Sequence, residues 1–66
     1  MKAATIKVYV VVIEHWADSS TLAGTKIGAV YTDEQAAIEE SDRLTAANSW
    51  THAFYVTRDI LVDIPD

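Results

Sequence analysis

The residues best suited to chemistry or binding are histidines, tryptophans and nearby carboxylates, which occur as Glu14, His15, Trp16 and Asp18 and again as Trp50 and His52. Imidazole and carboxylate groups that meet at one sheet edge could bind a divalent metal. Their spacing matches no known metal motif. We therefore interpret them as ordinary edge residues and expect neither a metal nor another cofactor.

The two tryptophans, Trp16 and Trp50, have two possible roles. Tryptophan at the edge of a small domain is enriched among binding hot spots, and it is equally common as a lid over one end of a core. The lid is the favoured interpretation. Both residues are also retained as candidate partner-binding residues.

Residue types that would support catalysis are scarce. The chain has no cysteine and no serine within a Gly-x-Ser-x-Gly elbow, and neither histidine has a sequence context that makes it a general base. Gly24 and Gly28 lack the Gly-Lys-Ser/Thr ending of a phosphate-binding loop. We expect no catalytic residues and predict that the chain is not an enzyme.

The charge is acidic, with ten carboxylates against five basic side chains and a formal net charge of −5. Nucleic-acid binding depends mainly on Lys and Arg, so direct contact with DNA or RNA is not expected. The acidity permits a basic partner, or it serves solubility alone. Glu34, Glu39 and Asp42 are accordingly either a solvated helix face or a negative surface that contacts a target.

Three strands and one helix are predicted. Residues 5–16 are β-branched and aromatic, residues 17–24 resemble a hairpin loop, residues 26–31 form a weaker strand with a possible bulge at Gly28, and residues 52–64 alternate until Pro65 ends the strand. Thr32 can cap a helix over residues 33–47, with Gln35 at capping-box spacing. Its inner stripe is thin, comprising Ala37, Ser41, Leu44 and Ala47 or Asn48, with Ile38 beside it.

These elements predict an α+β domain spanning residues 1–66 with the order ββαβ. The most apolar strand, the first, is expected at the centre, which gives a three-stranded sheet of order 2-1-3 with the helix on one face. The sequence does not decide which face, because the first strand is apolar on both sides. This arrangement brings the end of the first strand close to the start of the third.

One helix covers only one face of such a sheet, so the second face needs another cover. A second copy of the chain or a different protein would supply it. We expect self-association, with the contact residues drawn from Tyr9, Val11, Ile13, Tyr55 and Leu61 or from the acidic helix face. The alternative is a twisted sheet whose valines are partly exposed and bind no partner.

The basic start followed by residues 8–13, an apolar run, superficially resembles a signal peptide. The run is short and is followed by Glu14, His15 and Trp16, so we interpret it as a strand. It is also too short to span a bilayer. We expect a cytoplasmic protein without membrane contact.

A family resemblance covers nearly the whole chain. The valine-rich strand around Val8-Tyr9-Val10-Val11, the Val30-Tyr31 pair and the helix start Thr32-Asp33-Glu34-Gln35-Ala36-Ala37 resemble short ββαβ proteins of bacteriophages and bacterial genomes. The resemblance implies a role in binding. Some such proteins inhibit host defence enzymes such as CRISPR effectors, and others sequester signalling nucleotides as oligomers.

Two hypotheses follow. The first is a self-associating interaction protein that binds and inhibits another macromolecule, for example a host nucleic-acid-binding or defence protein, as an anti-CRISPR does. The alternative is an oligomer that sequesters a nucleotide between edge residues, namely Trp16, Trp50, His15, His52 and Lys26. Lys and Arg are few for holding phosphates, which counts against the alternative.

Overall fold

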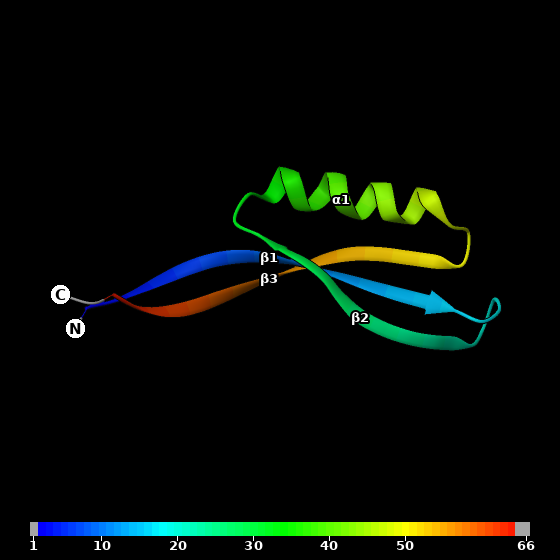
Figure 1. The fold of residues 1–66 in the computed structure, drawn as a ribbon, viewed down its shortest axis with the longest axis horizontal. Coiled ribbons are helices and arrows are strands. Elements are labelled where there is room, and N and C mark those ends of the chain that lie inside the picture. Colours follow the sequence, from blue (N-terminus) through cyan, green and yellow to red (C-terminus); the bar gives the residue numbers. More distant parts are fainter. Residues whose placement is uncertain (1, 65–66) are drawn as a thin grey trace.

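The computed structural model describes residues 2–64, and it has the predicted α+β fold. The elements follow in the order β1 (Lys2–Trp16), β2 (Leu22–Tyr31), α1 (Glu34–Ala47) and β3 (Thr51–Ile64). Both outer strands run antiparallel to β1, and the sheet order is β2-β1-β3 (Figure 1). The predicted order and the predicted central strand are confirmed.

The strands are longer than predicted. β1 begins at Lys2 rather than Thr5, β2 begins at Leu22 rather than Lys26, and β3 begins at Thr51 rather than His52. The predicted end of β3 at Pro65 lies outside the described residues. Gly28 is skipped in the register, where Val11 faces Ala29 and Val12 faces Ile27, so the bulge expected at this glycine is present.

The helix is capped by Asp33, which corrects the prediction of Thr32. An Asp33 carboxylate oxygen accepts a hydrogen bond from the Ala36 amide at 3.2 Å, and Asp33 has extended backbone angles. The Gln35 side chain donates to Glu39 at 3.5 Å and so takes part in a pair within the helix. The predicted inner stripe is confirmed for Ala37 and Ser41, which are buried, and for Leu44, which packs against the core. At the end of the helix the prediction is wrong, because Ala47 and Asn48 are exposed.

The helix covers the sheet face that carries the odd-numbered residues of β1. Val11 and Ile13 form a cluster with Ala37 of the helix and Ala53 of β3. Strand β2 also packs closely against this face of β1, since a Cβ atom at Gly28 would lie 2.7 Å from Cδ1 of Ile13. Aromatic rings close the cluster at one side, where Tyr9 and Tyr55 meet edge to face at 5.9 Å.

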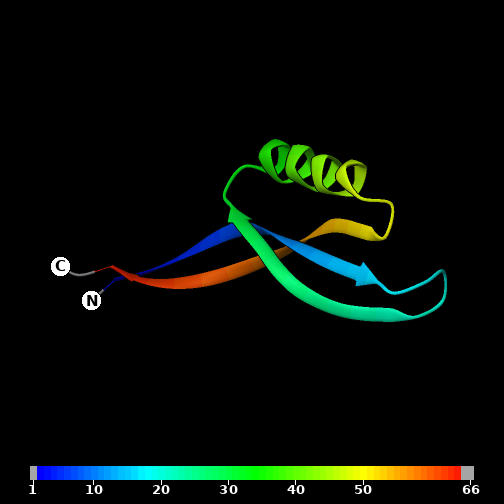
Figure 2. The same ribbon diagram turned by 45° about the vertical axis from the view of Figure 1, so that its right-hand side comes forward.

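The molecule has two parts, which we call the body and the arm. The body contains β2, α1, residues Tyr9–Trp16 of β1 and residues Thr51–Thr57 of β3. The arm contains the rest of β1 and β3, namely residues 2–8 paired with residues 58–64. Figures 1 and 2 show the arm as a two-stranded ribbon that projects from the body and ends at the two termini.

Candidate functional site

The predicted contact residues separate into covered and exposed ones. Val11 is fully buried and Ile13 is 6% exposed, because the helix lies on them, so these two belong to the core. Tyr9 and Tyr55 are half-buried at the border of the same cluster. Leu61 is 70% exposed, but it lies in the arm, away from the helix.

The uncovered sheet surface is the opposite one. Its central strand contributes Val10 and Val12, and their partners across the sheet are Val30 and Ile27 on β2 and Val56 and Phe54 on β3. We call these six residues the open face. Ile27 is 61% and Val30 is 54% exposed, whereas the other four are half-buried. All six side chains are apolar, so this surface resembles a core layer without a cover.

The sequence contained a signal for this choice of face. On the covered side, the neighbours of Val11 and Ile13 on β2 and β3 include small residues, namely Gly28, Ala29 and Ala53. On the open face the corresponding residues are isoleucine, valine and phenylalanine. A helix with an inner stripe of alanine and serine packs closely only on the smaller side.

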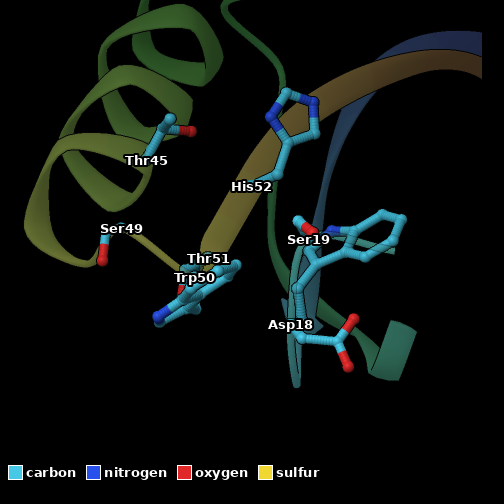
Figure 3. Close-up of a pocket in the computed structure, with 8 residues that line it drawn as sticks. Asp18, Ser19, Thr45, Ser49, Trp50, Thr51 and His52 are labelled. Atoms are coloured by element: carbon cyan, nitrogen blue, oxygen red, sulfur yellow. The ribbon is translucent and has the colours of Figure 1, made fainter. Parts of the chain in front are cut away.

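The tryptophan cluster lies at the end of the body far from the arm. The Trp16 amide donates to the Trp50 carbonyl oxygen at 2.8 Å, and His15 Nδ1 lies 3.4 Å from the Thr51 hydroxyl. A hollow of about 320 Å³ opens here, and Figure 3 shows the residues that line it, including Trp50, His52 and Asp18. The sequence-based expectation that the two tryptophan segments meet is therefore fulfilled.

The electrostatics of this hollow do not suit a phosphate. Asp18 accepts hydrogen bonds from the amide and the hydroxyl of Ser20, at 2.9 and 3.2 Å. The Ser20 amide, followed by the Thr21 hydroxyl, lowers the pKa of Asp18 below its usual value, so the carboxylate is ionised at neutral pH. Lys26, which would balance this charge, is opposite Ile13 on β1 and is not part of the lining.

A metal site does not form among the described residues, since residues 2–64 contain no group of three or more His, Asp or Glu side chains placed to hold an ion. The same part of the chain has no helix with the length and apolar character needed to cross a membrane.

The acidic residues of the helix do not form one surface. The Tyr55 hydroxyl donates to Glu34 at 3.1 Å, which ties Glu34 to the sheet and raises the pKa of Tyr55. At about 100° per residue, Glu39 lies roughly 140° around the helix from Glu34. Asp42 lines a second hollow, of about 240 Å³, between the helix and β3. The negative charge is thus spread around the helix.

Comparison with protein-family models, with curated proteins and with solved structures gave no match. The function is therefore argued from the geometry of this chain.

Proposed function

We propose that this chain is a non-enzymatic protein-interaction module that self-associates through its sheet and binds and inhibits another macromolecule. The observation that carries the proposal is the open face, where six apolar side chains from three strands lie together without a covering layer in the described structure. Contiguous apolar surface of this kind is characteristic of interaction sites.

The small size of the core supports the same conclusion. The buried apolar residues of the described chain are few, and two of them are alanines: Val8, Val11, Ile13, Ala37 and Ala53. A single core in a domain of this length rarely supplies more than about 3–5 kcal/mol of stability, and association commonly adds the rest. Covering Ile27 and Val30 would remove apolar surface from water at about 25 cal/mol per Å².

The charge favours a basic partner. A net charge of −5 attracts a positively charged protein and repels nucleic acid. Nucleic-acid-binding enzymes of bacterial defence, CRISPR effectors among them, carry such basic surfaces, and a phage-type counter-defence role is consistent with the family resemblance. The proposed mechanism is occlusion, in which the open face docks apolar side chains while the overall negative charge of the chain attracts the basic surface of the partner.

The experiment uses two exposed residues on opposite faces of the sheet. Ile27→Lys places a charge on the open face, and Leu61→Lys places the same charge on the other face of the arm. We expect the unmodified chain and Leu61→Lys to inhibit DNA cleavage by a purified defence nuclease, and Ile27→Lys to lose inhibition. Equal inhibition by all three proteins would show that the open face is not the contact surface.

A second candidate function rests on the hollow beside Trp16 and Trp50. Its volume and aromatic lining would accept a nucleobase, although Asp18 opposes the phosphates. A thermal shift on adding cyclic nucleotides or ADP-ribose, together with no inhibition of any nuclease, would favour nucleotide sequestration over the first proposal.

A further inference from the structure

The arm makes the molecule much longer than a compact domain of its size. The principal extents are 51 × 21 × 13 Å, and the radius of gyration is 15.0 Å, against about 11 Å expected for a compact chain of this length. The accessible surface is 4652 Å², roughly a tenth more than the about 4,200 Å² expected for a compact monomer. The arm thus exposes surface that compact proteins hide.

The direction of the backbone groups in the arm follows from a single hydrogen bond. The Trp16 amide points to β3, since it donates to the Trp50 carbonyl. The β1–β3 register has no shift, so the even-numbered residues of β1 bond to β3 and the odd-numbered ones point to the other edge. In the arm, Ala3, Thr5 and Lys7 therefore direct their N–H and C=O groups away from β3.

A contact on β3 confirms this alternation. Ala53 is opposite Ile13, an odd-numbered residue, so its backbone groups should point outward from the sheet. They do, because the Thr45 hydroxyl of the helix accepts from the Ala53 amide at 2.9 Å and lies 3.2 Å from its carbonyl oxygen. In the body, the helix thus satisfies the outer edge of β3 at this point.

The edge that carries Ala3, Thr5 and Lys7 lacks a neighbouring strand in the described structure. β2 occupies this edge of β1 only as far as the Tyr9–Tyr31 pair, and the chain then turns away toward the helix. Figure 2 shows β2 ending at this turn while β1 continues into the arm. A strand-sized slot remains in line with β2, bordered by backbone groups that require partners.

We infer that a second copy of the chain fills this slot, with the residue 2–8 segments of the two copies paired antiparallel about a two-fold axis at Thr5. The inference rests on the proposed self-association and specifies its geometry. Thr5 pairs with the partner's Thr5, and Ala3 pairs with the partner's Lys7. Each pair exchanges two hydrogen bonds, because all of these residues have the outward orientation.

The side-chain pattern suits this pairing. Antiparallel pairing of odd with odd residues keeps Ala4, Ile6 and Val8 of both copies on the same face. The even-numbered residues of β3 in the arm include Ile60, Val62 and Ile64, which extend that face, and Arg58, which lies on it opposite Val8. The product is a four-stranded antiparallel sheet with one mainly apolar face, interrupted by Arg58 of each copy, and a mainly polar reverse.

The outer edge of β3 is a poorer site for the same contact. Its outward-directed residues include Asp59 and Asp63, which flank Leu61. Antiparallel pairing centred on Leu61 would set each Asp59 opposite the partner's Asp63, and like charges directly opposite each other destabilise a sheet. The edge of β1 places no like charges opposite each other, since Lys7 meets an alanine.

The interface between the paired arms is smaller than a standard interface. A standard interface hides about 800 Å² on each partner. The excess surface of this chain over a compact monomer, roughly 450 Å², supplies about half of that value. The antiparallel pairing sets the two bodies at opposite ends of the paired arms, and each arm ends beside the partner's β2, which adds to the contact.

Hydrogen exchange on the unmodified protein tests the inference without a mutation. In a lone chain, the amides of Thr5 and Lys7 face water in the same way as those of Leu61 and Asp59, which lie directly across the arm. We expect Thr5 and Lys7 to exchange on the order of tenfold more slowly than Leu61 and Asp59, with protection that grows with protein concentration. Equal rates, or protection of Leu61 and Asp59 instead, would overturn the inference.

Matched proline variants then separate this inference from the proposed function. Thr5→Pro and Leu61→Pro each remove an outward-pointing amide at the same level of the arm, so both should leave the β1–β3 pairing intact. We expect Thr5→Pro to be monomeric by light scattering and Leu61→Pro to remain dimeric. A dimer that survives Thr5→Pro but not Ile27→Lys would refute the edge pairing while retaining self-association through the sheet.

Discussion

The body and the arm are built from the same two strands, and they differ in what surrounds those strands. In the body, β2 completes one edge and the helix covers one face, so that Val11 of β1 is fully buried. In the arm, Val8 beside the body is buried, but Ile6, Ile60 and Ile64 remain 41–44% exposed. An isolated two-stranded ribbon is at best marginally stable in water. The comparison indicates that the arm is the part of the fold that another chain completes.

The largest expected effect is a loss of stability caused by a substitution in the core of the body. Val11→Asp buries a charge in the core, which we expect to cost about 4 kcal/mol or more and to unfold most of the protein. Thr5→Asp lies on the same side of the same strand but is exposed in the arm, so it should reduce association and leave the helix intact. Circular dichroism during urea unfolding distinguishes the two variants, and a folded Val11→Asp protein would contradict the assignment of the core.

A smaller loss of stability is expected at Gly28 of β2, which packs closely against Ile13 on the helix-covered face. Gly28→Ala would place a methyl group 2.7 Å from Ile13 Cδ1, and we expect it to cost about 1–2 kcal/mol. Gly24 is the control, because a Cβ there meets no described atom within 4 Å. Thermal unfolding of both variants provides the measurement, and equal melting temperatures would mean that Ile13 moves aside freely.

The sequence predicted the elements and their order because those depend on local patterns. Strand one, the helix with Ala37 and Ser41 inward, and the bulge at Gly28 all follow from residue type and spacing. The ends of the strands did not follow. Residues 22–25 of β2 are exposed and patternless, and they are extended only because β1 provides a neighbour.

The choice of sheet face could not be predicted either, because both faces of β1 are apolar. Val11 and Ile13 are as apolar as Val10 and Val12, so β1 itself carries no preference. The deciding residues are the small ones on the neighbouring strands, such as Ala53, whose positions opposite β1 depend on register. The contact surface among the candidate sites therefore could not be assigned before the pairing was known.

The start of the helix provides a third test within the body. Asp33→Ala removes the side chain that accepts from the Ala36 amide, and we expect a loss of about 1 kcal/mol in the free energy of unfolding. Thr32→Ala should change that free energy by less than about 0.5 kcal/mol. Chemical denaturation of the pair measures the difference. A greater loss at Thr32 would restore the cap predicted from the sequence.

The last expected effect is a gain in stability, similar in size to the loss at Asp33. The Ser41 hydroxyl is buried between helix and sheet and has no hydrogen-bond partner among the described residues. Ser41→Ala removes this unsatisfied group and favours the helix, so we expect a stabilisation of about 1 kcal/mol. The melting temperature reports the change, and a clear decrease would mean that the hydroxyl does find a partner in solution.

The most direct test of the central claim, that the sheet of one chain is completed by another, is the mass of the unmodified protein in solution. Light scattering behind a sizing column over a range of concentrations measures this mass. We predict a mass twice the 7.3 kDa of one chain, maintained as the protein is diluted into the low micromolar range. A mass of one chain at every concentration would contradict the claim and would leave both the arm and the open face without a partner copy.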